Sequence, residues 1–333
     1  MVMGLFSTFY EYSQAPCLSS ALGRRCRVCY NINMSSVAVI LNPAAGGGRS
    51  GRRRRRLETD LQRSGLDWEL VVTRNKADMR SRIQACADTA AWLLIVGGDT
   101  SFRIAASEIL DRHHEKKTIP RLAFFGAGSA NDLTRGLGIR NLRHLCGLIR
   151  QNQVRQMDVG WVRTESPPRE HCFLGSMSLG LGVLVNREMA RTRGESGRPL
   201  AAWIPGAVAL RRVFNSHDLP MDLSVNGRPV TCSLAVVLNG PYYAGGLRLA
   251  PEASPFDHKL DLVLLSTRGW LSTLVAGVAV LVRRRLKAET GSDWNLKSKE
   301  TFSVQLDGDV FPAGRACTVG LHAAALSVAA GTE

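Results

Sequence analysis

The sequence predicts an α/β domain followed by a β-rich domain. Up to about residue 137, short apolar runs alternate with helical segments, and these runs are apolar throughout, as in parallel strands covered on both faces. After about Asp158 the pattern changes to a succession of short strands. We therefore expect an α/β domain with a parallel sheet covered on both faces on the N-terminal side, and a mainly antiparallel β-rich domain on the C-terminal side.

The first domain is expected to contain four strands, each followed by a helix. The expected strands are Val37–Leu41, Trp68–Val72, Trp92–Val96 and Leu122–Phe125. The expected helices are Arg49–Ser64, Lys76–Ala90, Phe102–Arg112 and Asn131–Leu137. This order builds a parallel sheet with helices on both faces.

The second domain is recognised by a hairpin and further short strands. Asn226-Gly227 is a preferred type I′ turn, and it separates the strand patterns Met221–Val225 and Arg228–Val230. The other expected strands are Val230–Leu238, Leu260–Leu265, Phe302–Leu306 and Cys317–Leu321. We divide the chain into a weakly structured extension (1–35), an α/β domain (36–160) and a β-rich domain (161–311).

Charge and composition limit the classes of partner that the protein is expected to bind. The formal net charge of +15 favours nucleic acid, a phosphorylated small molecule or an anionic membrane surface. Aromatic residues make up only 6% of the chain, and no spacing of a nucleic-acid-binding motif is visible, so no nucleic acid is expected. The apolar run Trp270–Val282 has the length of a buried helix and is well short of a bilayer span.

A glycine-rich loop, LNPAAGGGRSG at 41–51, follows the first strand and is suited to hold an anion. A P-loop is excluded, because Arg52-Arg53 stand where Lys-Ser/Thr is needed. Gly46, Gly48 and Gly51 match a dinucleotide-binding fingerprint, but Thr73-Arg74 stand where the ribose-binding acid is expected. An arginine there suits a 2′-phosphate, so an NADP-dependent oxidoreductase remains an alternative to an Asn-Pro-led phosphate loop.

The glycine-rich loop and two further segments resemble motifs of one known family. Residues 42–46 (NPAAG), 97–101 (GGDTS) and 128–135 (GSANDLTR) are similar to the NPxSG, GGDGT and GTxNDxAR motifs of the diacylglycerol kinase catalytic family, which includes sphingosine kinases and bacterial lipid kinases. Residues 245–253, 256–261 and 306–309 are similar to later motifs of that family. The matches follow the family order from about residue 37 to 315.

The resemblance implies a three-layer, Rossmann-like α/β domain and a C-terminal β-sandwich, a fold shared with NAD kinases and diacylglycerol kinases. Its final segment, here about 312–330, returns to the first domain. It implies ATP-dependent, Mg²⁺-dependent phosphorylation of a lipid hydroxyl, with the β-sandwich binding the lipid. The nucleotide would be bound by Asn42, Pro43, Gly46, Gly97, Gly98, Thr100, Ser101, Ser129 and Asn131. Asp309 is the expected base, Asp99 is the second candidate for base or Mg²⁺ ligand, and Asp257 with the Leu260 carbonyl would hold a structural metal.

Three departures from the family motifs leave a catalytically weakened or inactive relative as an alternative. Thr100 replaces a glycine, and a positive φ at this position would cost about 1–3 kcal/mol. Ile104 replaces a glutamate, and Asp309 replaces a longer glutamate. Simpler roles also remain open, since Asn131 can cap a helix and Asp307-Gly308 can form a hairpin turn.

The expected partner is a lipid substrate at a membrane surface. We expect a cytoplasmic protein that associates peripherally with the membrane, and a homodimer is an open alternative to a monomer. The apolar segments Pro205–Leu210 and Trp270–Val282 are candidates for lining an acyl-chain groove.

Overall fold

The computed structural model describes residues 36–128, 130–196, 220–266 and 286–331. All of them belong to one compact unit, Met34–Glu333. The expectations for residues 1–35, for Ser129 and for the apolar segments Pro205–Leu210 and Trp270–Val282 lie outside the described residues. Among the helices of the described part, none is long and apolar enough to cross a membrane.

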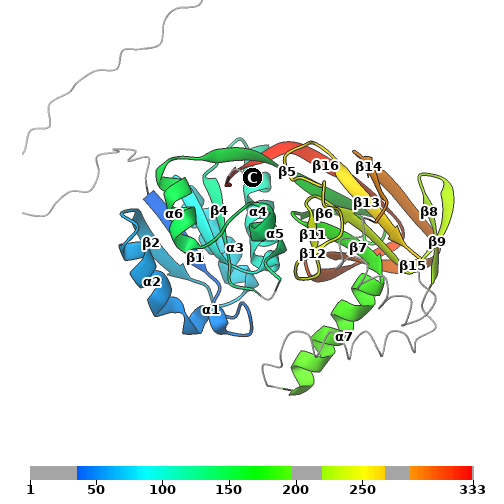
Figure 1. Cartoon of the computed structure of the whole chain (residues 1–333), viewed down its shortest axis with the longest axis horizontal. Helices are drawn as coiled ribbons and strands as arrows, with labels where there is room; N and C mark the ends of the chain where they lie inside the picture. Colours follow the sequence, from blue (N-terminus) through cyan, green and yellow to red (C-terminus); the bar gives the residue numbers. More distant parts are fainter. Residues whose placement is uncertain (1–35, 129, 197–219, 267–285, 332–333) are drawn as a thin grey trace, which may run out of the picture. The chain divides into compact units, whose positions relative to one another are not determined.

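The N-terminal region is a parallel sheet covered by helices (Figure 1). Its strands are β1 (Ser36–Leu41), β2 (Asp67–Val72), β3 (Trp92–Gly97) and β4 (Arg121–Gly126), in the spatial order β4-β3-β1-β2 with every pair parallel. Its helices are α1 (Arg49–Arg52), α2 (Arg54–Gln62), α3 (Lys76–Ala87), α4 (Asp99–His114), α5 (Asp132–Gly136) and α6 (Leu142–Arg150).

Alternate residues of each strand supply two separate cores. Ala38 and Ile40 of β1 pack with side chains of α3, α4 and α5 on one face of the sheet. Val37, Val39 and Leu41 of the same strand pack with α2 and α6 on the other face. Both faces are therefore buried, which explains the continuous apolar runs in the sequence and confirms the three-layer α/β arrangement.

The C-terminal region is largely antiparallel β-structure. Its elements are β5 (Val154–Thr164), β6 (Arg169–Phe173), β7 (Ser176–Gly180), α7 (Leu181–Ser196), β8 (Met221–Val225), β9 (Arg228–Cys232), β10 (Leu234–Leu238), β11 (Tyr242–Tyr243), β12 (Leu247–Arg248), β13 (Leu260–Leu265), β14 (Ala288–Gly291), β15 (Trp294–Leu306) and β16 (Asp309–Ala329). Side chains from β5 to β10, β13, β15 and β16 meet in one apolar core. The strands therefore enclose a core of their own, which confirms a β-rich C-terminal region.

The last strand, β16, connects the two regions (Figure 1). Its first part pairs with β15 and its longer second part with β5, both antiparallel. Near its end, Val328 lies opposite Leu122 of β4 in parallel orientation. One sheet path therefore runs from β14 through β16 to β2, and the chain end returns to the first region.

Most expected elements are present, although several of their bounds differ. The helix expected at Arg49–Ser64 is divided between α1 and α2, because Arg53 has a non-helical ψ of 7°. Helix α4 begins at Asp99, three residues before the expected start. The strand expected at Val230–Leu238 is two strands, since β9 pairs with β8, whereas β10 beyond Ser233 pairs with β7 and β13.

Candidate functional site

Three loops meet at the carboxyl ends of β1, β3 and β4. Asn42 follows β1, and its Nδ2 donates to Ser101 Oγ at 2.9 Å, while its Oδ1 accepts the Ala44 N–H at 3.1 Å. Pro43 continues this loop, and its carbonyl accepts the Gly51 N–H at 3.1 Å. Asn42 therefore fixes the first loop against the start of α4.

The glycines of these loops allow the backbones to approach closely. A Cβ on Gly128 would lie 2.9 Å from the Cα of Gly98, and a Cβ on Gly46 would lie 2.4 Å from the Ala127 carbonyl oxygen. A Cβ on Gly97 would collide with Ser101 at 2.6 Å. These positions exclude larger residues and leave main-chain groups facing the loop junction.

Asn131 closes the third loop. It has a positive φ of 57°, and its Oδ1 accepts the Gly128 N–H at 2.9 Å, so it ties its own loop together instead of capping α5 with its side chain. The structure thus brings Asn42, Gly46, Gly97, Gly98, Ser101 and Asn131 together, with Pro43 in the first loop. Ser129 lies outside the described residues.

Thr100 lies in the first turn of α4 and does not adopt a positive φ. The residue preceding the helix, Gly98, has an extended conformation with φ −113° and ψ −177°. The backbone strain considered for Thr100 is therefore absent. Ile104 is buried in the core at 2% exposure.

Glu108 does not take the place of the missing glutamate at position 104. It is buried, and its carboxylate binds Arg80 and the Gln84 side chain of α3, the latter at 2.6 Å. The side chain is therefore directed to α3.

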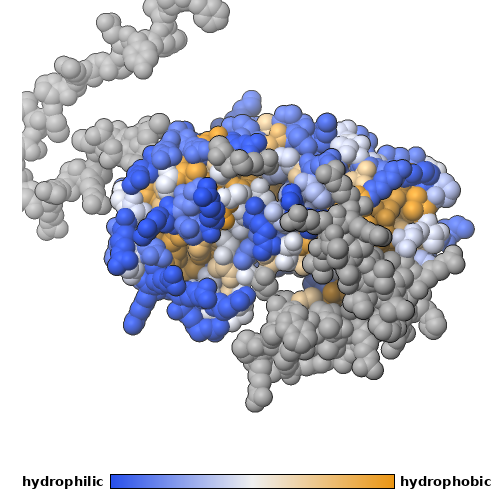
Figure 2. Space-filling model, in the orientation of Figure 1, coloured by the Kyte–Doolittle hydropathy of each residue, from blue (hydrophilic) through white to orange (hydrophobic). Residues whose placement is uncertain are grey.

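Basic side chains surround the glycine loop. Arg49 Nε donates to the Gly46 carbonyl oxygen at 2.9 Å, and residues 52–56 form an exposed run of five arginines. Arg54 pairs with Glu58 at 2.8 Å within α2. Figure 2 shows this part of the molecule, over α1 and α2, as a hydrophilic surface.

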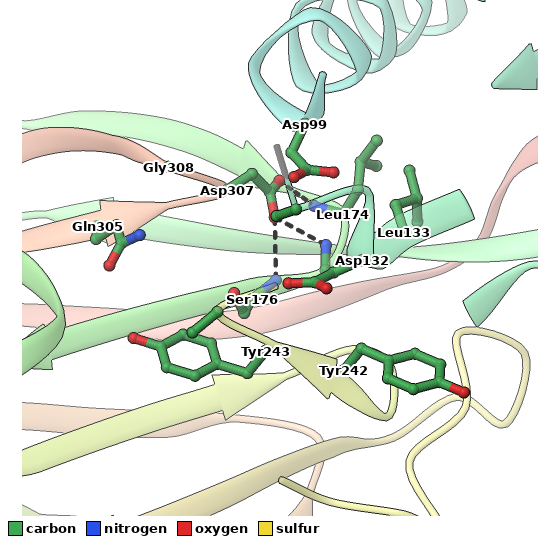
Figure 3. Close-up of a pocket in the computed structure, with 13 residues that line it drawn as sticks. Asp99, Asp132, Leu133, Leu174, Ser176, Tyr242, Tyr243, Gln305, Asp307 and Gly308 are labelled. Carbon is green, nitrogen blue, oxygen red and sulfur yellow. Dashed lines mark hydrogen bonds between the residues drawn. The ribbon is translucent and has the colours of Figure 1, made fainter. Parts of the chain in front are cut away.

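Asp99 stands at the start of α4, directly after Gly97-Gly98, and lines a pocket between the α/β loops and the β-rich region (Figure 3). Its Oδ1 is buried without a hydrogen-bond partner. Burial raises the pKa of Asp99 to about 7, and the neighbouring carboxylates of Asp307 and Asp132 raise it further. Asp99 can therefore gain or lose a proton near neutral pH.

Asp307 lies in the tight turn between β15 and β16. Asp307 and Gly308 have φ values of 46° and 93°, as the type I′ turn predicted for this dipeptide requires. The Asp307 carboxylate accepts the N–H groups of Leu174, Gly175 and Ser176 at 2.6, 2.9 and 3.0 Å. Burial raises the pKa of Asp307, while these three bonds lower it, and the net direction is upward.

Asp132, the first residue of α5, completes a group of three carboxylates (Figure 3). Its Oδ2 accepts the Gly245 N–H at 2.9 Å, whereas its Oδ1 is buried without a hydrogen bond and lies 3.8 Å from Arg135 Nη1. Burial raises the pKa of Asp132. Asp99 and Asp132 therefore each have one buried carboxylate oxygen that accepts no hydrogen bond from the described residues.

Asp309 is held elsewhere and is not among the residues that line the pocket. Its carboxylate pairs with Lys76 Nζ at 3.0 Å and with Arg103 Nη2 at 2.6 Å. Burial raises the pKa of Asp309, but the bonds and charges of Arg103 and Lys76 outweigh burial and lower it. The structure thus separates the two predicted catalytic carboxylates: Asp99 faces the pocket and Asp309 is ion-paired.

The predicted structural metal site lies in the turn before β13. Asp257 Oδ1 accepts the Lys259 N–H at 3.1 Å, and His258 has a φ of 62°. Leu260 begins β13. Among the described residues, no group of three or more His, Cys, Asp or Glu side chains is arranged to hold a metal ion. Asp257 and the Leu260 carbonyl therefore stay a prediction as ligands of a structural metal.

Several pocket residues were not predicted as functional from the sequence. Asp132 and Asp307 lie inside recognised motifs, but there they were explained as a helix start and a turn. Tyr243 and Gln305 also line the pocket, and no local pattern distinguishes them. Their positions depend on the pairing of strands that are distant in the sequence.

Comparison with known proteins agrees with this architecture. Residues 36–162 match the model of the diacylglycerol kinase catalytic domain. The chain is 25% identical over 260 residues to "Probable lipid kinase YegS-like" of Xanthomonas campestris pv. campestris, covering 75% of this chain and 82% of that protein. A homologue of the same name in Xanthomonas oryzae pv. oryzae is 25% identical over 264 residues, with the same shares covered.

A solved structure has the same fold. The crystal structure of a diacylglycerol kinase from Bacillus anthracis superposes with a TM-score of 0.68 at 20% identity, covering 89% of this chain and 97% of that one. Fold and comparisons together define the class: a lipid kinase homologue with an α/β region continued by a largely β region. Residues 36–162 are thus similar to the diacylglycerol kinase catalytic domain.

Proposed function

We propose that the protein is an ATP-dependent lipid kinase that transfers the γ-phosphoryl group to a lipid hydroxyl. The observation that carries this proposal is Asp99, a pocket carboxylate with a pKa of about 7 that directly follows the glycines at the end of β3. A base is most effective when its pKa lies near the working pH.

The glycine loops support binding of the triphosphate. Phosphate oxygens need main-chain N–H groups at close range, and the junction at Gly46, Gly97 and Gly98 has no side chains to prevent that approach. Asn42 and Asn131 hold the loops in place through their own hydrogen bonds. Arg49, bound to the Gly46 carbonyl, is a cation at the same loop.

The proposed step uses Asp99 as the base. The acceptor hydroxyl gives its proton to Asp99, its oxygen bonds to the γ-phosphorus, and the bond between that phosphorus and ADP breaks. The products are a lipid phosphate, ADP and protonated Asp99, which returns its proton to water. Mg²⁺ on the nucleotide would neutralise charge on the phosphates, and Asp132, whose Oδ1 accepts no hydrogen bond, is the carboxylate that would face it.

Asp309 is less suited to this role. Its two cationic partners stabilise the ionised carboxylate and lower its pKa, so it accepts a proton poorly near neutral pH. A positioning role in the contact between β16 and the helices α3 and α4 fits its ion pairs better.

The experiment uses labelled ATP, Mg²⁺ and mixed micelles that contain lipids with a free hydroxyl. Wild-type protein is expected to label a lipid, and Asp99→Asn is expected to lower the rate by roughly 10²–10⁴-fold. Below pH 7 the wild-type kcat/KM should fall, because Asp99 becomes protonated. Asp111→Asn, an exposed aspartate further along α4, serves as the matched control and should keep full activity.

The alternatives give different results. ATP binding without transfer to any lipid hydroxyl would mean a nucleotide-binding relative without catalysis. Stabilisation by NADP but not by ATP would indicate the oxidoreductase alternative. Arg74, the residue that would bind the 2′-phosphate, is already paired with Asp78 at 3.1 Å.

We further propose that the acceptor is met at a membrane surface by peripheral association, for which the net charge of +15 is favourable.

A further inference from the structure

A chain of hydrogen bonds beneath the pocket fixes the orientation of Gln305. The Tyr243 hydroxyl donates to Ser178 Oγ at 3.2 Å, and the Ser178 hydroxyl donates to Gln305 Oε1 at 2.9 Å. Tyr243 and Ser178 are buried, at 9% and 1% exposure. The three side chains come from β11, β7 and β15, so only the assembled β-rich region forms this chain.

The backbone of α7 packs closely against these three side chains at Gly182. A Cβ on Gly182 would lie 2.4 Å from Ser178 Oγ, 2.5 Å from the Tyr243 hydroxyl and 3.1 Å from Gln305 Oε1. Since Oε1 is bound to Ser178, the amide nitrogen of Gln305 must take the other direction. Figure 3 shows it turned toward Asp307 and Ser176, and within the described part of the chain it has no hydrogen-bond acceptor.

The donors of Gln305 face a pocket whose charged groups are all carboxylates. The Asp307 carboxylate already accepts three N–H groups, and Asp132 Oδ2 accepts one. In the described structure the Gln305 amide nitrogen has no such bond, and an unpaired amide donor in this pocket favours an oxygen acceptor on the ligand.

We propose that Gln305 is a specificity-determining residue that selects a glycerol-ester lipid, by donating to the ester carbonyl next to the hydroxyl that is phosphorylated. The placement of the hydroxyl at Asp99 rests on the proposed function. A glycerol ester presents a carbonyl oxygen beside its free hydroxyl, and the Gln305 N–H groups can bind it. A sphingoid base presents an ammonium group instead, which has only donors and leaves Gln305 unpaired.

The test measures binding by titration calorimetry with three short-chain ligands: 1,2-dihexanoylglycerol, its 1,2-dihexyl ether analogue, and an eight-carbon 2-amino-1,3-diol. The full chain is expected to bind the ester about tenfold more tightly than the ether, which lacks the carbonyl. Gln305→Leu should remove that preference. Gln305→Glu keeps an oxygen for Ser178 but replaces the donors, so it should also lose the ester preference and should bind the aminodiol more tightly.

The matched control is Gln156→Leu, at an exposed glutamine on β5 that binds Ser327 away from the pocket. It should keep the wild-type preference, and circular dichroism melting identifies any variant that is unfolded. Equal or no binding of ester and ether by the wild type, or an unchanged preference in both folded Gln305 variants, overturns the proposal.

This readout requires no phosphoryl transfer, so it is separate from the kinase assay. A Gln305-dependent ester preference without phosphorylation would overturn the proposed function and keep the specificity role. Phosphorylation of a lipid without an ester preference would support the proposed function and overturn the role of Gln305.

Discussion

At the scale of single residues, Asp99 combines a reactive position with a cost in stability. Its Oδ1 is buried and unpartnered, and the nearby carboxylates add repulsion to the desolvation of its charge. Buried acids of this kind are typical of functional sites, because an ordinary structural role would supply partners. The neighbouring residue Thr100, in contrast, has an ordinary helical backbone.

Asp99→Asn should therefore stabilise the fold in a pH-dependent way. The folded-state pKa of about 7 lies above the ordinary value of 3.8, so the wild type loses stability as pH rises from about 4 to about 7 and stays at the lower level above it. The variant does not titrate. Its advantage in unfolding free energy should reach a few kcal/mol at pH 8, since each pKa unit corresponds to about 1.4 kcal/mol.

Urea denaturation at pH 5 and pH 8 measures this difference, with Asp67→Asn at an exposed position of β2 as control. An advantage that is no larger at pH 8 than at pH 5 would contradict the burial of charge at Asp99.

Thr100→Gly should not raise activity. A gain from the relief of backbone strain would require a positive φ at threonine, and residue 100 has helical geometry instead. Glycine in the first turn of α4 should lower stability by about 0.5–1 kcal/mol because it loses more backbone entropy. Lipid phosphorylation rates and thermal melting of the variant check both statements, and faster turnover would mean that the threonine side chain obstructs the phosphates.

At the scale of elements, the ion pairs of Asp309 join β16 to α3 and α4. Arg103 is buried at 8% side-chain exposure, and its Nε has no partner in the described structure, so Asp309 is the carboxylate that compensates its charge. The lowered pKa of Asp309 means that its contribution to stability is present above the ordinary value of 3.8 and is lost as pH falls below that value.

Asp309→Asn should accordingly lower the unfolding free energy at pH 7 by about 3 kcal/mol, the effect of leaving a buried charge unpaired. Lipid phosphorylation per folded molecule should remain, because Asp99 is the proposed base. Loss of turnover in a variant that denaturation shows to be folded would instead support Asp309 as the base.

The sequence predicts elements better than it predicts the pocket, for a physical reason. Apolar periodicity is local, so β1 to β4 and most helices could be placed from it. Tertiary packing, in contrast, decides where the first helix is divided, at Arg53. It also decides where the partner strands change, at Ser233. The loops around Asn42 and Gly97 follow local motifs, whereas Gln305 and Tyr243 reach the pocket only through strand pairing across the β-rich region.

At the scale of the whole molecule, β16 makes the two regions one cooperative unit. Its pairing with β5 extends from Cys317 to Ala329, and Val328 also lies opposite Leu122 of β4. The two regions therefore share a strand and are not joined by a linker alone. Unfolding one region removes hydrogen-bond partners from the other, so we expect a single thermal transition for the described unit.

Val328→Pro tests this coupling. Proline removes a backbone N–H and distorts the strand in the middle of the sheet, so the variant should lose about 3 kcal/mol or more of stability. If β16 couples the regions, calorimetry should show one transition shifted to lower temperature, and both regions should melt together. Lys299→Pro is the control, because Lys299 lies in the irregular stretch of β15 between the paired residues Lys297 and Phe302. A second transition at the wild-type temperature in Val328→Pro would mean that the α/β and β-rich regions fold independently.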